Sequence, residues 1–487
     1  MSLLSSLTPQ PLWSYFEELT RIPRESKNEA AAVAWLVEQG REIGCEVEMR
    51  LIAPATGIGN VLFRKPATPG HEDRPGIILQ AHIDMVCVKT PNSAHDFTRD
   101  PLSLRFVGEK LFATDTTLGA DNGIGVAAAL AVLASRDLVH GPLEVLITVD
   151  EETGMTGAFR LDENWLRGQY LLNLDSEEDG CLTIGCAGGL DTVVQRRFTA
   201  LPAPAGKKAH LLKLSKLQGG HSGMQIDKGR FNAIRVLVEV LHPLMGEYGL
   251  QLAAFDGGEK RNAIPGEAGV VVWVDPAQEA KLLHHVAQEE AKWRAYLGPK
   301  EKDFSLTMSP TEADFCLPEA DAAALVGLLL ALPHGVEQMS AEVPGFVEAS
   351  VNLAIVHSDQ HQADVQIMSR GSSEMDVASL RQRIEAIAHL AGFATAHGNG
   401  YPGWKPLAGT AMERLLNATH EEIFGKPMHV SAVHAGLECG IIGSKYPGMQ
   451  MISFGPTIEG AHTPEENVAV SSVTSFWKLL VAALGKV

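Results

Sequence analysis

Short apolar runs alternate with longer amphipathic stretches along the first part of the chain. Apolar side chains recur at three- and four-residue spacing across residues 10–45, which predicts two helices ahead of a sheet. Further apolar runs predict buried strands at residues 60–64, 77–80, 143–149 and 170–174. An alanine-rich stretch at residues 126–135 predicts a helix between the second and third of these strands. This order predicts an α/β fold, with a mixed central sheet flanked by helices.

The pattern changes near residue 187 and changes back near residue 393. Between these points, strands and amphipathic helices alternate without acidic strand ends. After residue 393, a helix at residues 410–424, a strand at 449–454 and a helix at 470–484 resume the first pattern. We therefore expect one domain in two parts, residues 1–186 and 393–487, with an inserted α+β domain at residues 187–392. A chain of 487 residues is long enough for two hydrophobic cores.

Polar side chains follow several of the predicted strands in the first domain. His82 and Asp84 end the run that begins at Gly76, the triplet Asp150-Glu151-Glu152 follows the strand at 143–149, and Asp175 follows the strand at 170–174. The carboxyl ends of strands are where open α/β sheets bind ligands. We therefore expect these side chains to meet at one edge of the sheet.

Two further candidates lie in loops. Asp121 lies among small residues in Gly119-Ala-Asp121-Asn-Gly123, just before a predicted helix, and His462 follows the last predicted strand. Taken singly, each candidate has an ordinary structural explanation. Asp121 can cap a helix, the acidic triplet can form a solvated turn, and His82 can bond to a neighbouring carboxylate.

As a set, His82, Asp121, Glu152, Asp175 and His462 predict a metal site. Two imidazoles and three carboxylates form an N/O ligand set that suits Zn²⁺, with Co²⁺ or Mn²⁺ as alternatives. Five ligands fit two divalent ions that share one bridging carboxylate. Asp121, which the glycine-rich turn holds, is the natural bridge.

Charge and cysteine usage exclude other classes of protein. The net charge of −19 argues against nucleic acid as a partner, because phosphate binding needs a basic surface. The longest apolar runs, at residues 124–134 and 322–332, are shorter than the roughly 20 residues of a membrane-spanning helix. The six cysteines contain no CxxC pair, and the N-terminus lacks a signal-peptide pattern, so we expect a cytoplasmic protein without a membrane partner.

The motifs resemble, in order, those of the co-catalytic di-zinc peptidases, a family of carboxypeptidases, aminoacylases and carnosinase-like dipeptidases. The matching segments are His82-Ile-Asp84, Gly119-Ala-Asp121-Asn-Gly123, Asp150-Glu151-Glu152, Leu174-Asp175 and Gly460-Ala-His462. The long inserted domain, with His434-Ala-Gly-Leu-Glu438-Cys-Gly, is most similar to family members that cleave aminoacyl-histidine (Xaa-His) dipeptides in the bacterial cytosol. The resemblance implies a metallodipeptidase whose substrates, carnosine-like dipeptides included, have a free C-terminus.

The resemblance also implies roles for single residues. His82 and Asp175 would hold one zinc ion, Glu152 and His462 the other, and Asp121 both. Asp84 would orient His82. Glu151 would be the general base for a water activated by the two metals, which agrees with the need for a carboxylate that is not a ligand.

The inserted domain would act as a lid that binds the substrate. By the resemblance, His221 would stabilise the oxyanion, and Asn262 and Arg370 would bind the substrate carboxylate, a group that an arginine fork recognises bidentately. Glu438 is a further candidate for substrate binding. Carnosinase-like relatives deliver this histidine from a partner subunit, so in a homodimer His221 would come from the partner. The alternative is that the enlarged lid folds His221 back onto its own chain.

Two other functions fit the same sequence. An N-acyl-amino-acid deacylase or a tripeptide aminopeptidase of the same fold would share the metal ligands. A zinc-stabilised binding protein without catalysis is the alternative from another class. Glu151 argues against it, because a structural zinc site needs no spare base beside its ligands.

Overall fold

The computed structural model describes residues 3–398 and 400–487, and these form two compact units. The first unit contains the chain up to Cys186, then Trp404–Ala432 and Leu437–Val487. The second unit contains Ala187–Gly403 and the short segment Val433–Gly436. Each unit has its own sheet.

A mixed eight-stranded sheet forms the centre of the first unit, with the order β1-β2-β6-β3-β7-β23-β8-β22. In chain order its strands are β1 (Glu46–Ala53), β2 (Ile58–Lys65), β3 (Ile77–His82), β6 (Leu143–Thr148), β7 (Tyr170–Asn173), β8 (Cys181–Cys186), β22 (His429–Val433) and β23 (Gln450–Ser453). Strand β3 pairs in parallel with β6 and with β7, whereas β1 and β2 pair antiparallel. The predicted α/β class with a mixed central sheet is confirmed.

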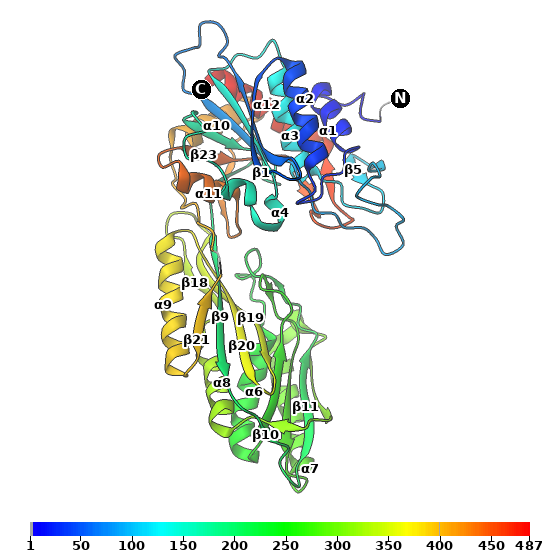
Figure 1. Ribbon diagram of the computed structural model, residues 1–487, viewed down its shortest axis with the longest axis vertical. Helices are drawn as coiled ribbons and strands as arrows, with labels where there is room; N and C mark the ends of the chain where they lie inside the picture. Colours follow the sequence, from blue (N-terminus) through cyan, green and yellow to red (C-terminus); the bar gives the residue numbers. More distant parts are fainter. Residues whose placement is uncertain (1–2, 399) are drawn as a thin grey trace. The chain divides into compact units, whose positions relative to one another are not determined.

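Helices cover this sheet. They are α1 (Gln10–Leu19), α2 (Ala30–Ile43), α3 (Ala120–Ala134), α4 (Glu151–Gly154), α5 (Thr156–Phe159), α10 (Ala411–Phe424), α11 (Glu438–Lys445) and α12 (Val470–Lys486). Helix α2 contacts β2, and the alanine-rich α3 contacts β3 and α1, so these helices form one layer (Figure 1). Every residue of β3 and β6 is buried, as expected for central strands of a sheet that carry almost continuous apolar sequence.

A small four-stranded sheet completes the first unit. Its order is β24 (Ile458–Glu459), β25 (Asn467–Ala469), β5 (Lys110–Ala113) and β4 (Leu104–Val107). The antiparallel pairing of β24 with β25 closes the loop that carries His462 and Glu466. Segments more than 300 residues apart in the sequence thus form one sheet.

An antiparallel sheet dominates the second unit, with the order β16-β11-β15-β13-β19-β20-β9-β21 and β18 paired to β19. Its strands are β9 (Gly188–Arg197), β11 (Lys208–Ser215), β13 (Gln251–Gly257), β15 (Ala268–Val274), β16 (Ser305–Pro310), β18 (Gly335–Met339), β19 (Val347–Ser358), β20 (Gln362–Gly371) and β21 (Ala394–His397). Two short pairs lie outside it, β10 (Leu201–Pro202) with β17 (Phe315–Cys316) and β12 (Gly220–His221) with β14 (Ala263–Ile264).

Four long helices pack with this second sheet around one apolar core. They are α6 (Ala233–Tyr248), α7 (Glu279–Leu297), α8 (Glu319–Ala331) and α9 (Glu374–Leu390), with a short 3₁₀ turn η1 (Gly298–Glu301) after α7. Asn232 caps α6 by accepting hydrogen bonds from two backbone N–H groups, and Ser373 with Asp376 forms a capping box at α9. Helices α6 and α9 therefore begin at side-chain caps and bury apolar side chains in the core.

The end of the second unit differs from the boundary expected at residue 393. Strand β21 pairs antiparallel with β9, so the chain stays in the second sheet beyond that point, and the first unit resumes at Trp404. The sequence gives no sign of this, because β21 is only four residues long and largely exposed. Within the part of the chain that the structure describes, no helix has the length and apolarity of a membrane span.

Candidate metal centre

Three neighbouring strands of the first unit bring candidate ligands to one edge of the sheet. Strand β3 ends at His82 and lies between β6 and β7 in parallel register. The turn after β6 carries Glu151 and Glu152, and the turn after β7 carries Asp175. The carboxyl ends of parallel strands meet at the same edge, so strand order alone makes these side chains neighbours.

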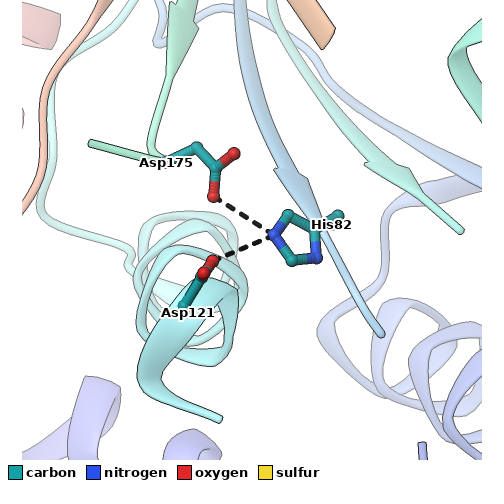
Figure 2. A group of neighbouring side chains, drawn as sticks. All are labelled: His82, Asp121 and Asp175. Atoms are coloured by element: carbon teal, nitrogen blue, oxygen red, sulfur yellow. Dashed lines mark hydrogen bonds and ion pairs between the residues drawn. The ribbon is translucent and has the colours of Figure 1, made fainter. Parts of the chain in front are cut away.

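Asp121 contacts both candidate histidines, one with each carboxylate oxygen. Its Oδ1 lies 3.1 Å from His82 Nε2, and its Oδ2 lies 3.3 Å from His462 Nε2. Asp175 Oδ1 lies 3.2 Å from the same His82 nitrogen, so two carboxylates converge on it (Figure 2). His462 Nε2 also lies 2.9 Å from Glu152 Oε2. The five predicted ligands thus form two groups of three that share Asp121.

Asp84 fixes the positions of three residues around it. Its Oδ1 lies 3.3 Å from His82 Nδ1 and accepts a hydrogen bond of 3.1 Å from the backbone N–H of Glu151. Its Oδ2 accepts a hydrogen bond of 3.2 Å from the backbone N–H of Glu152. One fully buried carboxylate therefore faces an imidazole and holds the backbone of the two glutamates at the start of α4.

Glu151 begins α4 and belongs to a group with His82 and Glu152 whose ligand atoms lie within 4.8 Å of one another. Burial raises the pKa of Glu151 well above its ordinary value, and the charges of Asp175 and Glu152 add to this effect against that of His82. A carboxyl group whose proton affinity is raised by its surroundings suits a general base.

Charge crowding in this cluster also shifts the histidines. Hydrogen bonds to Asp121 and Glu152 raise the pKa of His462 to about 11. Burial alone would lower the pKa of His82, but Asp175 and Asp121 raise it well above its ordinary value. The carboxylates therefore require positive charge among them, which protons or metal cations can supply.

The donor set fits divalent metal ions. His82, Asp121 and Asp175 form one compact group, and Asp121, Glu152 and His462 form the other. Among the described residues, the buried Glu152 Oε1 has no hydrogen-bond partner, so it retains an acceptor for a cation. Imidazole and carboxylate ligands suit Zn²⁺, Co²⁺ or Mn²⁺ better than thiophilic metals.

His221, in the second unit, is half-buried on the short strand β12, which pairs with β14. Its Nδ1 accepts hydrogen bonds from the backbone N–H groups of Gly223 and Met224, at 3.2 and 3.1 Å. A ring nitrogen that accepts two N–H groups carries no proton, so the proton of the neutral ring lies on Nε2. His221 is therefore held as an Nε2 donor.

Asn262 and Arg370 lie in contrasting surroundings in the same unit. Asn262 is exposed in the turn before β14, and its carbonyl accepts a hydrogen bond of 2.8 Å from the Ser222 N–H. Arg370, near the end of β20, is only 4% exposed. Its Nη1 donates to the Tyr401 hydroxyl at 2.8 Å, while Nε is buried without a hydrogen-bond partner among the described residues. The guanidinium thus keeps a buried donor for an anion.

Known proteins show which family these features belong to. The sequence profile of peptidase family M20/M25/M40 matches residues 78–486. The chain belongs to this peptidase family. Membership makes it a hydrolase of peptide bonds.

Individual relatives agree with the family match. The chain is 40% identical over 489 residues to the cytosol non-specific dipeptidase of Escherichia coli strain K12, covering 100% of this chain and 99% of that protein. The crystal structure of aminoacylhistidine dipeptidase from Vibrio alginolyticus matches with a TM-score of 0.89 at 40% identity, over 100% of this chain and 98% of that one. A tripeptidase from Staphylococcus aureus matches in fold alone, with a TM-score of 0.57 at 16% identity over 99% and 98% of the two chains.

Glu438, predicted as a substrate-binding residue, lies close enough to the metal cluster of this M20/M25/M40 peptidase for its charge to act on Glu151. Its side chain is 0% exposed, and Oε2 accepts hydrogen bonds of 2.6 Å from Gln80 Nε2 and from Thr148 Oγ1. Both partners belong to the central strands β3 and β6. The structure therefore places Glu438 inside a buried polar network of the first unit, where burial raises its pKa to about 8.

Several residues that shape the metal centre were not among the predicted site residues. Asn122 donates to the Leu174 carbonyl at 2.9 Å and to Asp175, Glu29 accepts from the Asp150 N–H at 2.9 Å, and Glu466 accepts from the turn before Asp121. Asn122 lies in the motif Gly119-Ala-Asp121-Asn-Gly123, next to a predicted ligand. Glu29 and Glu466 carry no such signal, because only the fold brings them to the site.

Proposed function

We propose that this M20/M25/M40 peptidase is a metal-dependent dipeptidase. Its substrates are dipeptides with a free C-terminus, and Xaa-His dipeptides, carnosine-like ones included, are among them. The single observation that carries the proposal is the position of Asp121, whose two oxygens face the two histidines at 3.1 and 3.3 Å. A carboxylate shared in this way fits a pair of ions that act together.

His82 and Asp175 would hold one ion, Glu152 and His462 the other, and Asp121 both. Zinc is the expected metal, because two imidazoles and three carboxylates suit it, with cobalt or manganese as alternatives. When bound, such ions polarise a substrate carbonyl and lower the pKa of water. The remaining chemistry falls to side chains of the protein.

Glu151 acts as the general base. It takes a proton from the attacking water and returns it to the nitrogen of the leaving amine, so that the C–N bond breaks without release of a free amide anion. Asp84 keeps this geometry by accepting the Glu151 N–H while it faces His82. In this arrangement Glu152 is a metal ligand and the neighbouring Glu151 is the general base.

Residues of the second unit recognise the substrate in this proposal. His221 donates Nε2–H to the oxyanion that develops at the cleaved carbonyl. Arg370 and Asn262 bind the substrate carboxylate. Arg370 Nε, which is buried and has no hydrogen-bond partner among the described residues, supports this role. We expect the protein in the cytoplasm, where its free cysteines stay reduced, and we expect it as a homodimer.

Metal-stripped and reloaded protein tests the proposal. The stripped enzyme should lose hydrolysis of alanyl-histidine and β-alanyl-histidine and regain it with Zn²⁺, Co²⁺ or Mn²⁺. N-acetyl amino acids, tripeptides and C-terminally amidated dipeptides should be cleaved more slowly than the free dipeptides. Faster cleavage of N-acetyl amino acids would make the chain a deacylase, and faster cleavage of tripeptides would make it a tripeptide aminopeptidase.

A further inference from the structure

The carboxylate of Glu466 accepts hydrogen bonds from four consecutive backbone N–H groups. Oε2 accepts from Leu118 and Gly119 at 2.8 and 2.9 Å, and Oε1 accepts from Ala120 and Asp121 at 2.8 and 3.3 Å. The side chain is only 2% exposed. These N–H groups lie just before the regular part of α3, because the backbone is not helical at Asp121 and Asn122. Glu466 therefore satisfies donors of an irregular turn rather than donors inside a helix.

Arg24 holds the same turn from its carbonyl side. Its Nη2 donates to the Gly119 carbonyl at 2.6 Å, and its Nη1 donates to the carbonyls of Ile83 and Asp84 at 2.9 and 3.2 Å. The turn before Asp121 is therefore tied to the end of β3, directly after His82. The backbone of Gly119 has φ 66°, and a Cβ there would lie 2.3 Å from Arg24 Nη2, so both conformation and space require glycine.

The loop that carries Glu466 also carries a predicted ligand. His462 precedes Glu466 by four residues, and both lie between β24 and β25. One end of this loop thus faces Asp121 through the imidazole of His462, while the other end holds the backbone of Asp121 through Glu466. A shift of this loop would move His462 and Asp121 relative to each other.

The geometry points to Glu466 as a positioning residue, which holds Asp121 in the orientation that places one oxygen toward His82 and the other toward His462. Glu466 is buried and lies outside both groups of predicted ligands, so it would act through Asp121. Through Asp121 it sets how tightly the paired metal ions bind, as residues behind metal ligands commonly do. The inference rests on the proposed metal site, but its test needs no substrate.

The test compares Glu466→Gln with Glu465→Gln. Glutamine has the same shape but offers one acceptor oxygen and an NH₂ group, which cannot satisfy all four N–H groups. Glu465 is the exposed neighbour and provides a matched control. Competition with a chelator should show that Zn²⁺ binds about 10–100-fold more weakly to Glu466→Gln than to wild type, whereas Glu465→Gln should equal wild type.

Unfolding measured with and without Zn²⁺ separates positioning from a general loss of stability. A mutation that only weakens the fold lowers the stability of both forms equally. A mutation that weakens metal binding reduces the gain in stability that Zn²⁺ provides, by about 1.4 kcal/mol for each tenfold loss of affinity. We expect the reduced gain for Glu466→Gln and the full gain for Glu465→Gln.

Equal Zn²⁺ affinity and equal Zn²⁺-dependent stabilisation in the two variants would overturn the inference. If Glu466→Gln does not fold, Glu466→Asp replaces it, because aspartate keeps the charge but is one methylene shorter. Glu466→Asp should also bind Zn²⁺ more weakly than Glu465→Gln, and equal binding would again refute the role of Glu466. If Zn²⁺ binds as expected in wild type but no dipeptide is cleaved, the proposed activity fails while this inference stands.

Discussion

The two units hold their candidate site residues in different ways. In the first unit, the predicted ligands contact one another, and buried groups fix the turns that carry them, as Asp84 does for Glu151 and Glu152. In the second unit, His221 lies on a strand of two residues, Asn262 is exposed in a turn, and Arg370 is buried in a long strand. Metal ligands need tight geometry, and the sheet edge supplies it. The difference implies that metal binding and substrate recognition can be damaged separately.

The largest effect is expected for Asp121→Ala, because both proposed ions depend on this carboxylate. Bound Zn²⁺, measured by atomic emission after gel filtration, should fall below two ions per chain, and dipeptide hydrolysis should be abolished. Asp137→Asn, which changes an exposed acid of the same unit, is the control and should keep both metal and activity. Two tightly bound ions in Asp121→Ala would contradict the bridging role.

Glu151→Gln should lower the rate of hydrolysis without changing the metal content of the first unit. Loss of a general base typically costs ~10²–10⁴-fold in rate, so kcat should fall by that factor while the Zn²⁺ content stays as in wild type. Single-turnover rates and metal analysis on the same sample test this. Near-normal turnover in the metal-replete variant would remove Glu151 from the mechanism.

His221→Ala should lower turnover through the second unit and leave metal binding in the first unit unchanged. Removal of an oxyanion donor lowers kcat by ~10²–10³-fold, and Zn²⁺ affinity should not change. His242→Ala is the matched control, because His242 is an exposed histidine on α6 of the same unit. If the two variants have equal kcat, His221 does not contact the developing oxyanion.

Arg370→Ala should raise KM for dipeptides by about 10–100-fold, the usual cost of losing hydrogen bonds to a charged group. It should also remove most of the preference for free dipeptides over their C-terminal amides. Arg383→Ala, at an exposed arginine paired with Glu337, serves as the control. An unchanged preference in Arg370→Ala would show that another group binds the carboxylate.

The last effect, which is small near neutral pH, concerns the stability of the second unit in acid. Burial, together with the charge of Arg370 and against that of Asp227, lowers the pKa of His434 to about 3, and His434 Nε2 lies 2.7 Å from Ser350 Oγ. The unfolded chain, with a histidine pKa of ~6.5, binds a proton between that value and about 3 that the folded chain does not. The contribution of neutral His434 to the free energy of unfolding is therefore complete above pH ~6.5. Below that pH it falls as the pH is lowered, by up to about 1.4 kcal/mol per pH unit.

His434→Asn should make this acid loss less steep than in wild type. Urea unfolding of the metal-free proteins at pH 7, 6 and 5 measures the difference. His361→Asn changes an exposed histidine of the same unit and should keep the wild-type slope. Parallel slopes for wild type and His434→Asn would show that His434 is not the group that titrates.

Much of the first unit could be predicted from the sequence, because apolar runs that end in polar side chains mark central strands of a parallel arrangement. This pattern predicts that His82 and Asp175 lie at one edge of the sheet, and His82 Nε2 and Asp175 Oδ1 lie 3.2 Å apart. Which oxygen of Asp121 faces which histidine could not be predicted, since it depends on how the start of α3 and the loop between β24 and β25 meet in the fold. Nor can the sequence distinguish Glu466 from Glu465, which have the same side chain and opposite surroundings. The burial of Glu438 and Arg370 likewise depends on neighbours distant in sequence.

The two histidines of the metal centre differ sharply in exposure. The side chain of His82 is 1% exposed, whereas that of His462 is 52% exposed. An ion on the His462 side would have one exposed ligand that water can replace, because Asp121 and Glu152 are only 11% and 5% exposed. An ion on the His82 side would have no such route through its histidine. Metal exchange should therefore be biphasic, and brief treatment of the zinc form with a second metal should yield a mixed pair with the foreign ion on the His462 side.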